Sequence, residues 1–391
     1  MLLTTEPTES TFLFTSESVG EGHPDKVCDQ IADAILDACL QQDPLSKVAI
    51  EAAARPGLIF VFGVLDTQAQ IDIEAIVRVV LKDIGYESPE QELDYKTCQV
   101  MDHVERRAAP DFAAPSVFLS PTDTEAAGDQ GIIFGYASNE TSQSLPLTID
   151  LSHRITRQMK AARLDGTLPW LLPDTKTQVT VEYVRRKNGE INPLRVHTIV
   201  LTAQHTKDVT VEELRQEVFE KVICKAVPAK FLDEQTAYHI QPTGDLGVTP
   251  SGKFAGVTGR KIVVDTYGGW GAHGGGAFSG KDYRQVDRSA AYMARWIAKS
   301  IIHAGLADRC LIQLSYSIGI SEPLSIFVET YGTGKTTDLQ LERIVSENFD
   351  MRPASIAKKL GLTSPIYYQT SKNGHFTNPG FPWEKPKDLV L

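Results

Sequence analysis

A glycine-rich segment followed by a lysine is the part of this sequence best suited to binding a charged ligand. Residues 268–280 hold seven glycines in thirteen positions, and Lys281 follows directly. A helix or a strand with so many glycines would be costly in conformational entropy, whereas a loop lets the backbone approach a ligand closely. We expect a strand at residues 262–264 before the loop and a helix beginning near Asp287 after it. Since the dipole of a helix N-terminus favours negative charge, the segment predicts a polyphosphate site.

A second candidate lies near the start of the chain, in residues 20–26. Pro24 suits the first turn of a helix, because the N–H that it lacks has no helical partner there. His23, Asp25 and Lys26 would then meet at the positive end of that helix. A histidine can donate to a phosphate oxygen, an aspartate can bind Mg²⁺ and a lysine can neutralise charge. A capped polar turn without a ligand explains the same residues equally well.

Other charged residues stand beside strand-like runs. Asp129 lies between two glycines, and Asp174 precedes Lys176 at the start of an apolar run. Each alone is also compatible with an Asx turn or with a solvent-facing charge. Taken together, the cationic side chains could balance about four negative charges; they are His23, Lys176, Arg260, Lys261 and Lys281. With Asp25 and Asp287 as metal ligands, this set favours an intact triphosphate. The sequence has neither a GxxxxGK[ST] loop nor the lysine and catalytic-loop set of kinases.

Length, charge and cysteine usage narrow the class of protein. A chain of 391 residues is expected to form two or three domains. The net charge of −11 argues against a nucleic-acid surface, although a local basic pocket is compatible with it. The five cysteines are widely spaced without a CxxC pair, which favours neither a zinc site nor a disulfide framework. Neither a leader segment nor a membrane-spanning run is evident, so we expect a cytoplasmic protein.

The order helix, strand, strand, helix occurs three times along the chain, at intervals of domain size. The predicted helices lie at residues 27–38, 73–84, 147–155, 211–222, 286–301 and 339–349, and the predicted strands at 48–54, 58–65, 179–184, 196–203, 311–318 and 324–328. A further short apolar run ends each copy, such as residues 238–240 or 366–368. Chance recurrence of a common pattern is the alternative.

This repeat predicts an α+β fold, built from α/β layers. Its three similar αββαβ domains would lie about a pseudo-threefold axis, at residues 11–110, 124–246 and 247–386. Helices would cover one face of each sheet, so the other face needs a partner. We therefore expect the sheets to pack on those of a homodimer partner.

Three segments together carry a resemblance to a known family. Residues 14–26, 128–131 and 265–287 are similar to the S-adenosylmethionine synthetase (methionine adenosyltransferase) family, and the resemblance runs from about residue 11 to the C-terminus. It implies a dimer or a dimer of dimers with active sites between subunits. The methionine sulfur would attack C5′ of ATP and expel triphosphate, which is then hydrolysed to phosphate and pyrophosphate. Two Mg²⁺ ions would be required and K⁺ would activate.

The resemblance also implies roles for individual positions. His23, Lys176 and Lys281 would be catalytic, with His23 at the bridging oxygen of the leaving group. Asp25 and Asp287 would bind Mg²⁺, and Glu51 would bind K⁺. The ATP and triphosphate contacts would be His23, Lys26, Asp129, Asp174, Lys176, Arg260, Lys261, Lys281 and Ile318, the last from the neighbouring subunit. A thioether has no proton to lose, so catalysis would rest on alignment and charge stabilisation.

Departures from the family pattern gather around the acceptor. Val64 stands where the family has glutamate, Ala114 or Pro115 where it has glutamine, and Gln285 where it has lysine. Phe254 lies in a segment where the family has an aspartate that this chain lacks. Burying an ammonium group without such partners would cost several kcal/mol. Three functions stay open at this point: S-adenosylmethionine synthesis, transfer of adenosine or a related nucleoside to another acceptor, and nucleotide binding with little activity.

Overall fold

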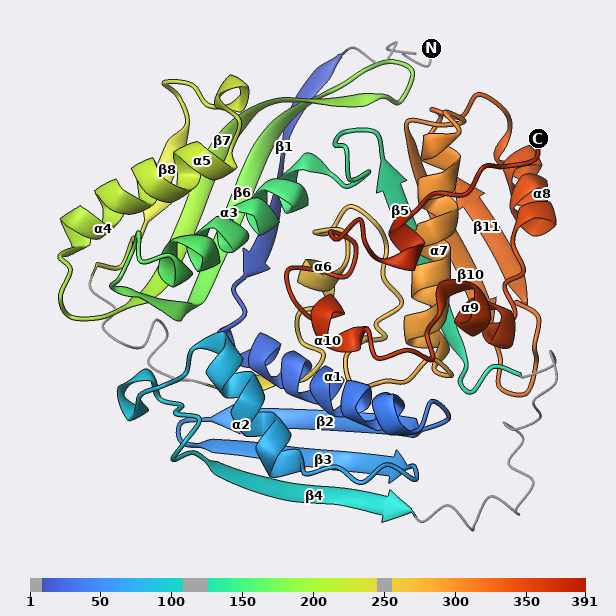
Figure 1. The fold of residues 1–391 in the computed structure, drawn as a ribbon. Helices are drawn as coiled ribbons and strands as arrows, with labels where there is room; N and C mark the ends of the chain where they lie inside the picture. The colour runs from blue at the N-terminus through green and yellow to red at the C-terminus, as the bar shows by residue number, and fades with distance from the viewer. Residues whose placement is uncertain (1–8, 108–125, 245–254) are drawn as a thin grey trace, which may run out of the picture.

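Three β-sheets surround a central region in the computed structural model, which describes residues 9–107, 126–244 and 255–391 (Figure 1). A long helix packs on each sheet from the side of this centre. These helices are α1 (Pro24–Gln42), α3 (Leu147–Leu164) and α7 (Val286–His303). The predicted α+β fold of three similar units is confirmed. No helix of the described segments is long and apolar enough to cross a membrane.

The first sheet has the strand order β4-β3-β2-β9 and is covered by α1 and α2 (Ile73–Ile84). Its strands are β2 (Lys47–Arg55), β3 (Leu58–Asp66), β4 (Gln99–Arg107) and β9 (Gly256–Val257). Alternating residues of β2, from Val48 to Ala54, point into the core because successive strand side chains face opposite sides. Gly57 makes the turn to β3 with a φ of 69°.

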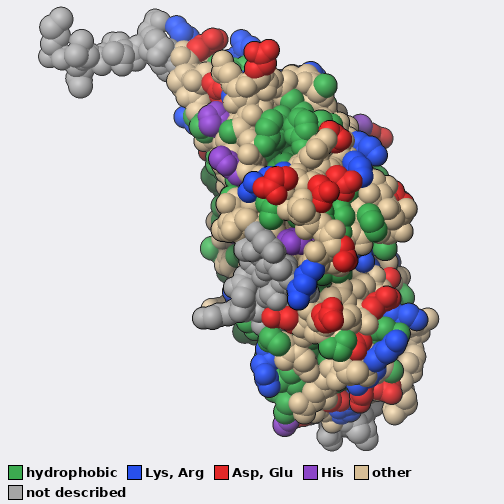
Figure 2. Space-filling model, turned by 90° about the vertical axis from the view of Figure 1, so that its left-hand side faces the viewer, with side chains coloured by type: hydrophobic (Ala, Val, Ile, Leu, Met, Phe, Trp, Pro, Cys, Tyr) green, Lys and Arg blue, Asp and Glu red, His purple; other side chains and the backbone are tan. Residues whose placement is uncertain are grey.

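The second sheet has the order β1-β6-β7-β8, and the third has the order β11-β10-β5. Their strands are β1 (Ser10–Val19), β5 (Gly131–Ser138), β6 (Leu171–Arg185), β7 (Ile191–His205), β8 (Ala237–Ile240), β10 (Arg309–Tyr316) and β11 (Ser325–Glu329). The remaining helices include α4 (Val211–Val218), α5 (Cys224–Ala226), α6 (Ile262–Asp265), α8 (Asp338–Asn348), α9 (Pro353–Leu360) and α10 (Tyr367–Thr370). The face that carries α4 and β8 has acidic and basic side chains side by side (Figure 2).

Each sheet takes one strand from another unit, in a cyclic exchange. β1 precedes α1 but pairs with β6, and β5 precedes α3 but pairs with β10. β9 precedes α7 but pairs with β2. The three units are therefore joined by backbone hydrogen bonds, and each sheet crosses the boundaries expected from the sequence. The domain bounds 11–110, 124–246 and 247–386 stay a prediction for this reason.

Two short apolar runs form helices where the sequence predicted strands. Residues 262–265 form α6, in which the N–H of Asp265 donates to the carbonyl of Lys261 at 2.8 Å. The run at 366–368 enters α10, because the Asp37 carboxylate accepts the N–H groups of Tyr367 and Tyr368. Runs of three residues are too short for periodicity to distinguish helix from strand. A tertiary contact decides the second case.

Candidate active site

The N-terminus of α1 gathers one group of charged side chains, which we call the α1 cluster: His23, Asp25, Arg260 and Lys261. Asp25 is 1% exposed, and Lys261 Nζ lies 2.6 Å from its Oδ2 atom. Arg260 Nε lies 3.5 Å from the other carboxylate oxygen, which also accepts the N–H of Val257. Pro24 occupies the first turn, as predicted, and His23 caps the helix. A carboxylate at this position is favoured by the helix dipole.

His23 is held as a neutral hydrogen-bond donor. Burial, followed by the charge of Lys261, lowers the pKa of His23 to about 4. Its Nδ1 atom accepts the N–H of Asp25 at 3.2 Å. Because Nδ1 is the acceptor, the proton of the neutral ring sits on Nε2. That N–H can donate to a phosphate oxygen without a change of charge.

Strands β1 and β6 add a lysine and two acids beside this cluster. Lys176 Nζ lies 2.9 Å from Glu17 Oε2, and the ion pair lowers the pKa of Glu17 despite the opposing effect of burial. Asp174 is buried, and burial together with the charges of Asp25 and Glu92 raises its pKa to about 7. Since Lys176 also acts on the pKa values of His23 and Asp174, these groups share one electrostatic neighbourhood.

The glycine-rich loop and the start of α7 form a second group, the α7 cluster: Glu51, Lys281 and Asp287. Lys281 Nζ lies 2.7 Å from Asp287 Oδ2. A Cβ atom at Gly276 would lie 2.3 Å from Asp287 Cγ, so only glycine lets the loop pass so close to the carboxylate. Burial raises the pKa of Glu51 against the opposing charge of Lys281. The loop and helix start therefore agree with the prediction.

The two clusters lie at different places along β2. Val257, which bonds to Asp25, pairs with Ala53, whereas Lys281 bridges to Ala49. Four strand residues span about 13 Å. One chain therefore holds the predicted phosphate-binding cations in two separate groups. In the described part of the chain, no group of three or more His, Cys, Asp or Glu residues could hold a metal ion. Each cluster instead offers one aspartate, Asp25 or Asp287, whose hard oxygen atoms suit Mg²⁺.

Comparison with known proteins decides the family. Three family models match consecutive segments: the S-adenosylmethionine synthetase N-terminal domain at residues 11–109, the central domain at 124–246 and the C-terminal domain at 248–385. The S-adenosylmethionine synthase of Clostridium tetani (strain Massachusetts / E88) is 49% identical over 387 residues, which cover 96% of this chain and 97% of that protein. The chain belongs to the S-adenosylmethionine synthetase family. It is thus an enzyme of a methionine adenosyltransferase family, and the alternative readings gain no support from these relatives.

Lys26 lies in a buried ion-pair network, and its role as a phosphate contact stays a prediction. Lys26 is 2% exposed, and its ammonium group lies 2.9 Å from Asp29 Oδ2 and 2.7 Å from Asp265 Oδ1. Both carboxylates are buried with it. The ammonium group of Lys26 therefore pairs with Asp29 and Asp265, whereas Asp25 pairs with Lys261. Adjacent helix residues point about 100° apart, so Lys26 and Asp25 have different partners although they are neighbours in the sequence.

Asp129 and Ile318 lie together but outside both clusters. The Asp129 carboxylate accepts the N–H of Gln130, and Ile318 is 53% exposed in the turn after β10. Backbone bonds join Ala127 to Gly319 and Ile320, so this turn packs beside the segment that carries Asp129. Their contacts with a substrate stay predictions.

Two of the family departures meet in one small cavity. Val64 and Gln285 line a cavity of about 270 Å³ that also contains Asp66, Lys47 and Arg107. Asp66 lies two residues after Val64 on β3 and therefore on the same face of the strand. Its carboxylate lies 3.5 Å from Lys47 Nζ. The cavity thus holds charges of both signs. Ala114 and Phe254 lie outside the described residues.

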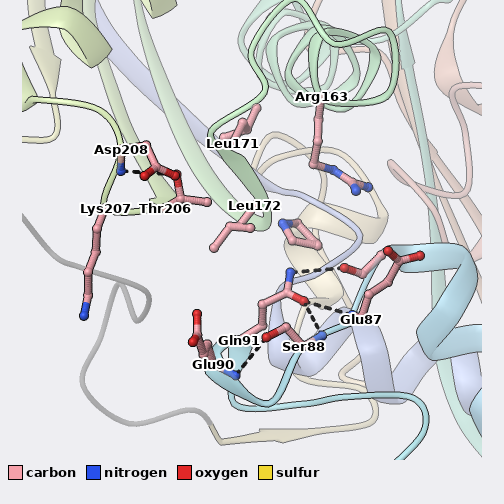
Figure 3. A pocket seen from close by; sticks show the side chains of 12 residues that line it. Glu87, Ser88, Glu90, Gln91, Arg163, Leu171, Leu172, Thr206, Lys207 and Asp208 are labelled. Atoms are coloured by element: carbon pink, nitrogen blue, oxygen red, sulfur yellow. Dashed lines mark hydrogen bonds between the residues drawn. The ribbon is translucent and has the colours of Figure 1, made fainter.

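A larger cavity of about 710 Å³ adjoins Pro173, next to Asp174. Arg163 reaches into it from α3 toward the loop with Glu87, and Lys207 stands on the opposite wall (Figure 3). The Arg163 side chain donates to the carbonyl of Ile84 at 2.7 Å. None of the residues lining this cavity belongs to either cluster. Size alone therefore does not identify the site.

Sequence reasoning missed Glu17, the ion-pair partner of Lys176, and Asp66. Glu17 lies in β1, whose side chains alternate between the two faces of the sheet. Its position opposite residue 178 of β6 is set by the pairing of two strands that belong to different units. Asp66 follows Val64 at the spacing of one strand face. Because this two-residue spacing is visible in the sequence, Asp66 could have been predicted to lie beside Val64.

Proposed function

We propose that this chain synthesises S-adenosylmethionine from ATP and methionine, releases triphosphate and hydrolyses it to phosphate and pyrophosphate. One observation carries the proposal: in a member of this family, each of the two clusters pairs a Mg²⁺-type carboxylate with a lysine. Asp25 pairs with Lys261, and Asp287 pairs with Lys281. These pairs hold the four side chains in place before a nucleotide binds. Binding of a triphosphate would exchange the partners, so that the lysines contact phosphate and the carboxylates bind metal.

A second copy of the chain would complete the site. Apolar side chains on the uncovered sheet faces are more than one third exposed, among them Phe62, Ile132 and Phe327 at 39%, 51% and 45%. Glu51 lies opposite Phe62 on the neighbouring strand, and Glu17 shares the exposed face of β1 with Leu13, which is 49% exposed. Packing of these faces in a homodimer would bury the apolar side chains. It would also bring the α1 cluster of one subunit to the α7 cluster of its partner.

The charged side chains would stabilise the departing triphosphate. His23 donates from Nε2 to the bridging oxygen, while Lys176, Arg260, Lys261 and Lys281 contact the phosphates. Two Mg²⁺ ions, at Asp25 and Asp287, would neutralise phosphate charge, and K⁺ would bind Glu51. Ile318 would pack on adenine, with Asp129 and Asp174 near the adenosyl and methionyl groups. Electrostatic stabilisation of this kind is worth most in a site that excludes water.

The small cavity suits the amino-acid end of methionine. Its walls hold two carboxylates, Asp66 and Asp282, and three cations, Lys47, Arg107 and Arg284. Asp66 would bind the ammonium group, and Lys47 and Arg107 would bind the carboxylate of the amino acid. Asp66 thereby replaces the acidic group that is missing at Val64. Val64 and Gln285 supply a neutral wall between the charges.

Incubation of the purified protein with ATP, methionine, Mg²⁺ and K⁺ tests the activity. Mass spectrometry should detect S-adenosylmethionine, together with phosphate and pyrophosphate in equal amounts. The Lys281→Ala variant serves as the negative control. Product formation no higher than in this control would refute the proposal.

A mixed dimer tests the composite site. Chains with Lys261→Ala and Lys281→Ala, each carrying a different affinity tag, are co-expressed and the doubly tagged dimer is purified. If each site uses one cluster from each subunit, one of the two sites in this dimer is intact, and activity returns to about half of the wild-type value. If each chain builds its own site, the mixed dimer stays as inactive as the single variants.

A further inference from the structure

Helix α1 carries four aspartates that form a ladder along one face: Asp25, Asp29, Asp33 and Asp37. They are spaced four residues apart, which places them one above the other on the helix. Like charges at this spacing repel, and burial adds a desolvation cost. Asp25, Asp29 and Asp33 are nevertheless at most 1% exposed. Such an unfavourable arrangement needs partners that compensate the buried charge.

The carboxylate of each of these four aspartates, which we call a rung of the ladder, accepts backbone N–H groups from a segment far along the chain. The donors are Val257 to Asp25 at 3.1 Å, Gly259 to Asp29 at 2.8 Å, Gly280 to Asp33 at 2.9 Å, and Tyr367 and Tyr368 to Asp37 at 2.9 and 2.8 Å. Three of the four rungs hold segments that carry candidate site residues. The fourth holds α10, which carries none.

The Asp29 rung fixes the backbone that precedes two cations of the α1 cluster. Gly259 donates to Asp29 Oδ1, and Arg260 and Lys261 follow directly. Lys26 lies 2.9 Å from the other oxygen and also contacts Asp265, so the carboxylate cannot rotate away. Gly259 has a φ of 80°, and a Cβ atom there would lie 2.7 Å from Ala277 Cβ. The backbone at Gly259 is therefore closely packed, and its hydrogen bond to Asp29 keeps it in this position.

Asp33 fixes both ends of the segment that carries Lys281 and Asp287 of the α7 cluster. Gly280, whose N–H donates to Asp33, directly precedes Lys281. Arg288, which directly follows Asp287, forms a bidentate pair with Asp33 at 2.6 and 2.8 Å. The same guanidinium donates to the carbonyl of Lys281 at 3.1 Å. Asp33 and Arg288 are both fully buried.

We propose that Asp29 and Asp33 are positioning residues for catalysis. Asp29 sets Arg260 and Lys261, Asp33 sets Lys281 and Asp287, and α1 fixes the separation of the two clusters. The two rungs are about 6 Å apart along the helix. This inference rests on the proposed function, because it assigns the two clusters to the triphosphate. The ladder would then serve two half-sites of the dimer from a single helix.

Three variants of the full-length protein test the proposal: Asp29→Asn, Asp33→Asn and Asp37→Asn. Asparagine keeps the shape and one oxygen acceptor but removes the charge. Asp37→Asn is the matched control, since Asp37 lies on the same ladder but binds α10, which carries no candidate site residue. Helix α10 touches the Asp33–Arg288 pair through the Thr370 hydroxyl, which accepts from Arg288 at 2.9 Å. The measurements are urea unfolding, kcat and KM for ATP, and calorimetric binding of tripolyphosphate with Mg²⁺.

Asp29→Asn should weaken tripolyphosphate binding and raise KM for ATP, each about tenfold, because its loop carries two phosphate contacts. Asp33→Asn should lower kcat about 10- to 100-fold, since small misplacements of catalytic groups have effects of this size. Asp37→Asn should change unfolding only. If Asp33→Asn fails to fold, Asp33→Glu keeps the charge with a longer side chain and should lower kcat in the same way.

The proposal is overturned if Asp29→Asn and Asp33→Asn match Asp37→Asn in kcat, KM and tripolyphosphate affinity while the wild type makes S-adenosylmethionine. A wild type that makes no S-adenosylmethionine, with tripolyphosphate binding that Asp29→Asn still weakens, would refute the proposed function and leave the positioning role supported.

Discussion

The α1 and α7 clusters use the same pair of groups in different surroundings. Asp25 and Lys261 approach to 2.6 Å, and Asp287 and Lys281 approach to 2.7 Å. Asp25 is 1% exposed and has three further polar neighbours, whereas Asp287 is 19% exposed and has Lys281 as its ion-pair partner. The carboxylate of the α1 cluster is therefore enclosed by its own chain, while the carboxylate of the α7 cluster is more open. This difference is expected if the α7 cluster receives its remaining contacts from a partner subunit.

The largest effects are expected when the lysine of either cluster is removed, and they should distinguish the catalytic role of each lysine from its structural role. Lys261→Ala and Lys281→Ala should both lower kcat about 100- to 1000-fold, since each removes a charge that stabilises the leaving group. Only Lys261→Ala should also lower the free energy of unfolding, by about 3 kcal/mol, because it leaves Asp25 buried with a weakened set of partners. Steady-state kinetics and urea unfolding measure the two effects.

Lys221→Ala provides the control for these lysine variants, because Lys221 forms an ion pair with Glu217 on the surface of the π-helical turn after α4. It should change neither quantity. Equal destabilisation by Lys261→Ala and Lys281→Ala would contradict the view that the two clusters differ in enclosure.

Two histidines extend the comparison with a smaller effect. His23 belongs to the α1 cluster, and His273 lies in the glycine-rich loop, where its Nδ1 accepts the N–H of Gly275. His23→Ala should lower kcat for adenosyl transfer about 10- to 100-fold, as loss of one hydrogen bond to a charged group predicts. KM for ATP should change less. His273→Ala should leave kcat nearly unchanged. A rise in KM as large as the fall in kcat would argue against a role of His23 at the leaving group.

The sequence predicted the elements better than their assembly. The long stripes of α1, α2, α3 and α7 are all helices, because apolar spacing over many residues identifies a helix well. The exchange of β1, β5 and β9 between sheets was not foreseeable, since pairing across units leaves no local pattern. The same holds for α10, whose first turn depends on the carboxylate of Asp37.

The sequence supplied the residue types of the candidate site, but the direction and the grouping of their side chains could not be read from it. His23, Asp25, Arg260 and Lys261 come together as one set, but Lys26 turns into the core toward Asp29 and Asp265. Which face of a helix is buried depends on segments more than 200 residues away. The separation of the α1 and α7 clusters likewise follows from two loops meeting β2 at different positions.

A substitution in the small cavity beside the α7 cluster should change KM about tenfold for only one of the two substrates. Asp66→Asn should raise KM for methionine about tenfold with little change in kcat or in KM for ATP, because a charged hydrogen bond to the ammonium group is lost. Asp102→Asn is the control, since Asp102 is a partly exposed carboxylate on the neighbouring strand β4 and pairs with Arg106. An unchanged KM for methionine in Asp66→Asn would remove Asp66 from the acceptor site.

The smallest expected effect concerns K⁺ and again distinguishes the clusters. Glu51 projects from β2 beside Lys281, and burial raises its pKa, so the structure leaves its charge only partly balanced. A monovalent cation there would supply the missing charge without displacing Lys281 from Asp287. Glu51→Gln should therefore lose the stimulation of kcat by K⁺ over Na⁺ while keeping the unstimulated rate. Glu17→Gln, in the neighbourhood of the α1 cluster, should keep the full K⁺ response. If both variants respond to K⁺ as the wild type does, the cation binds elsewhere, and the α7 cluster works through Lys281 and Asp287 without it.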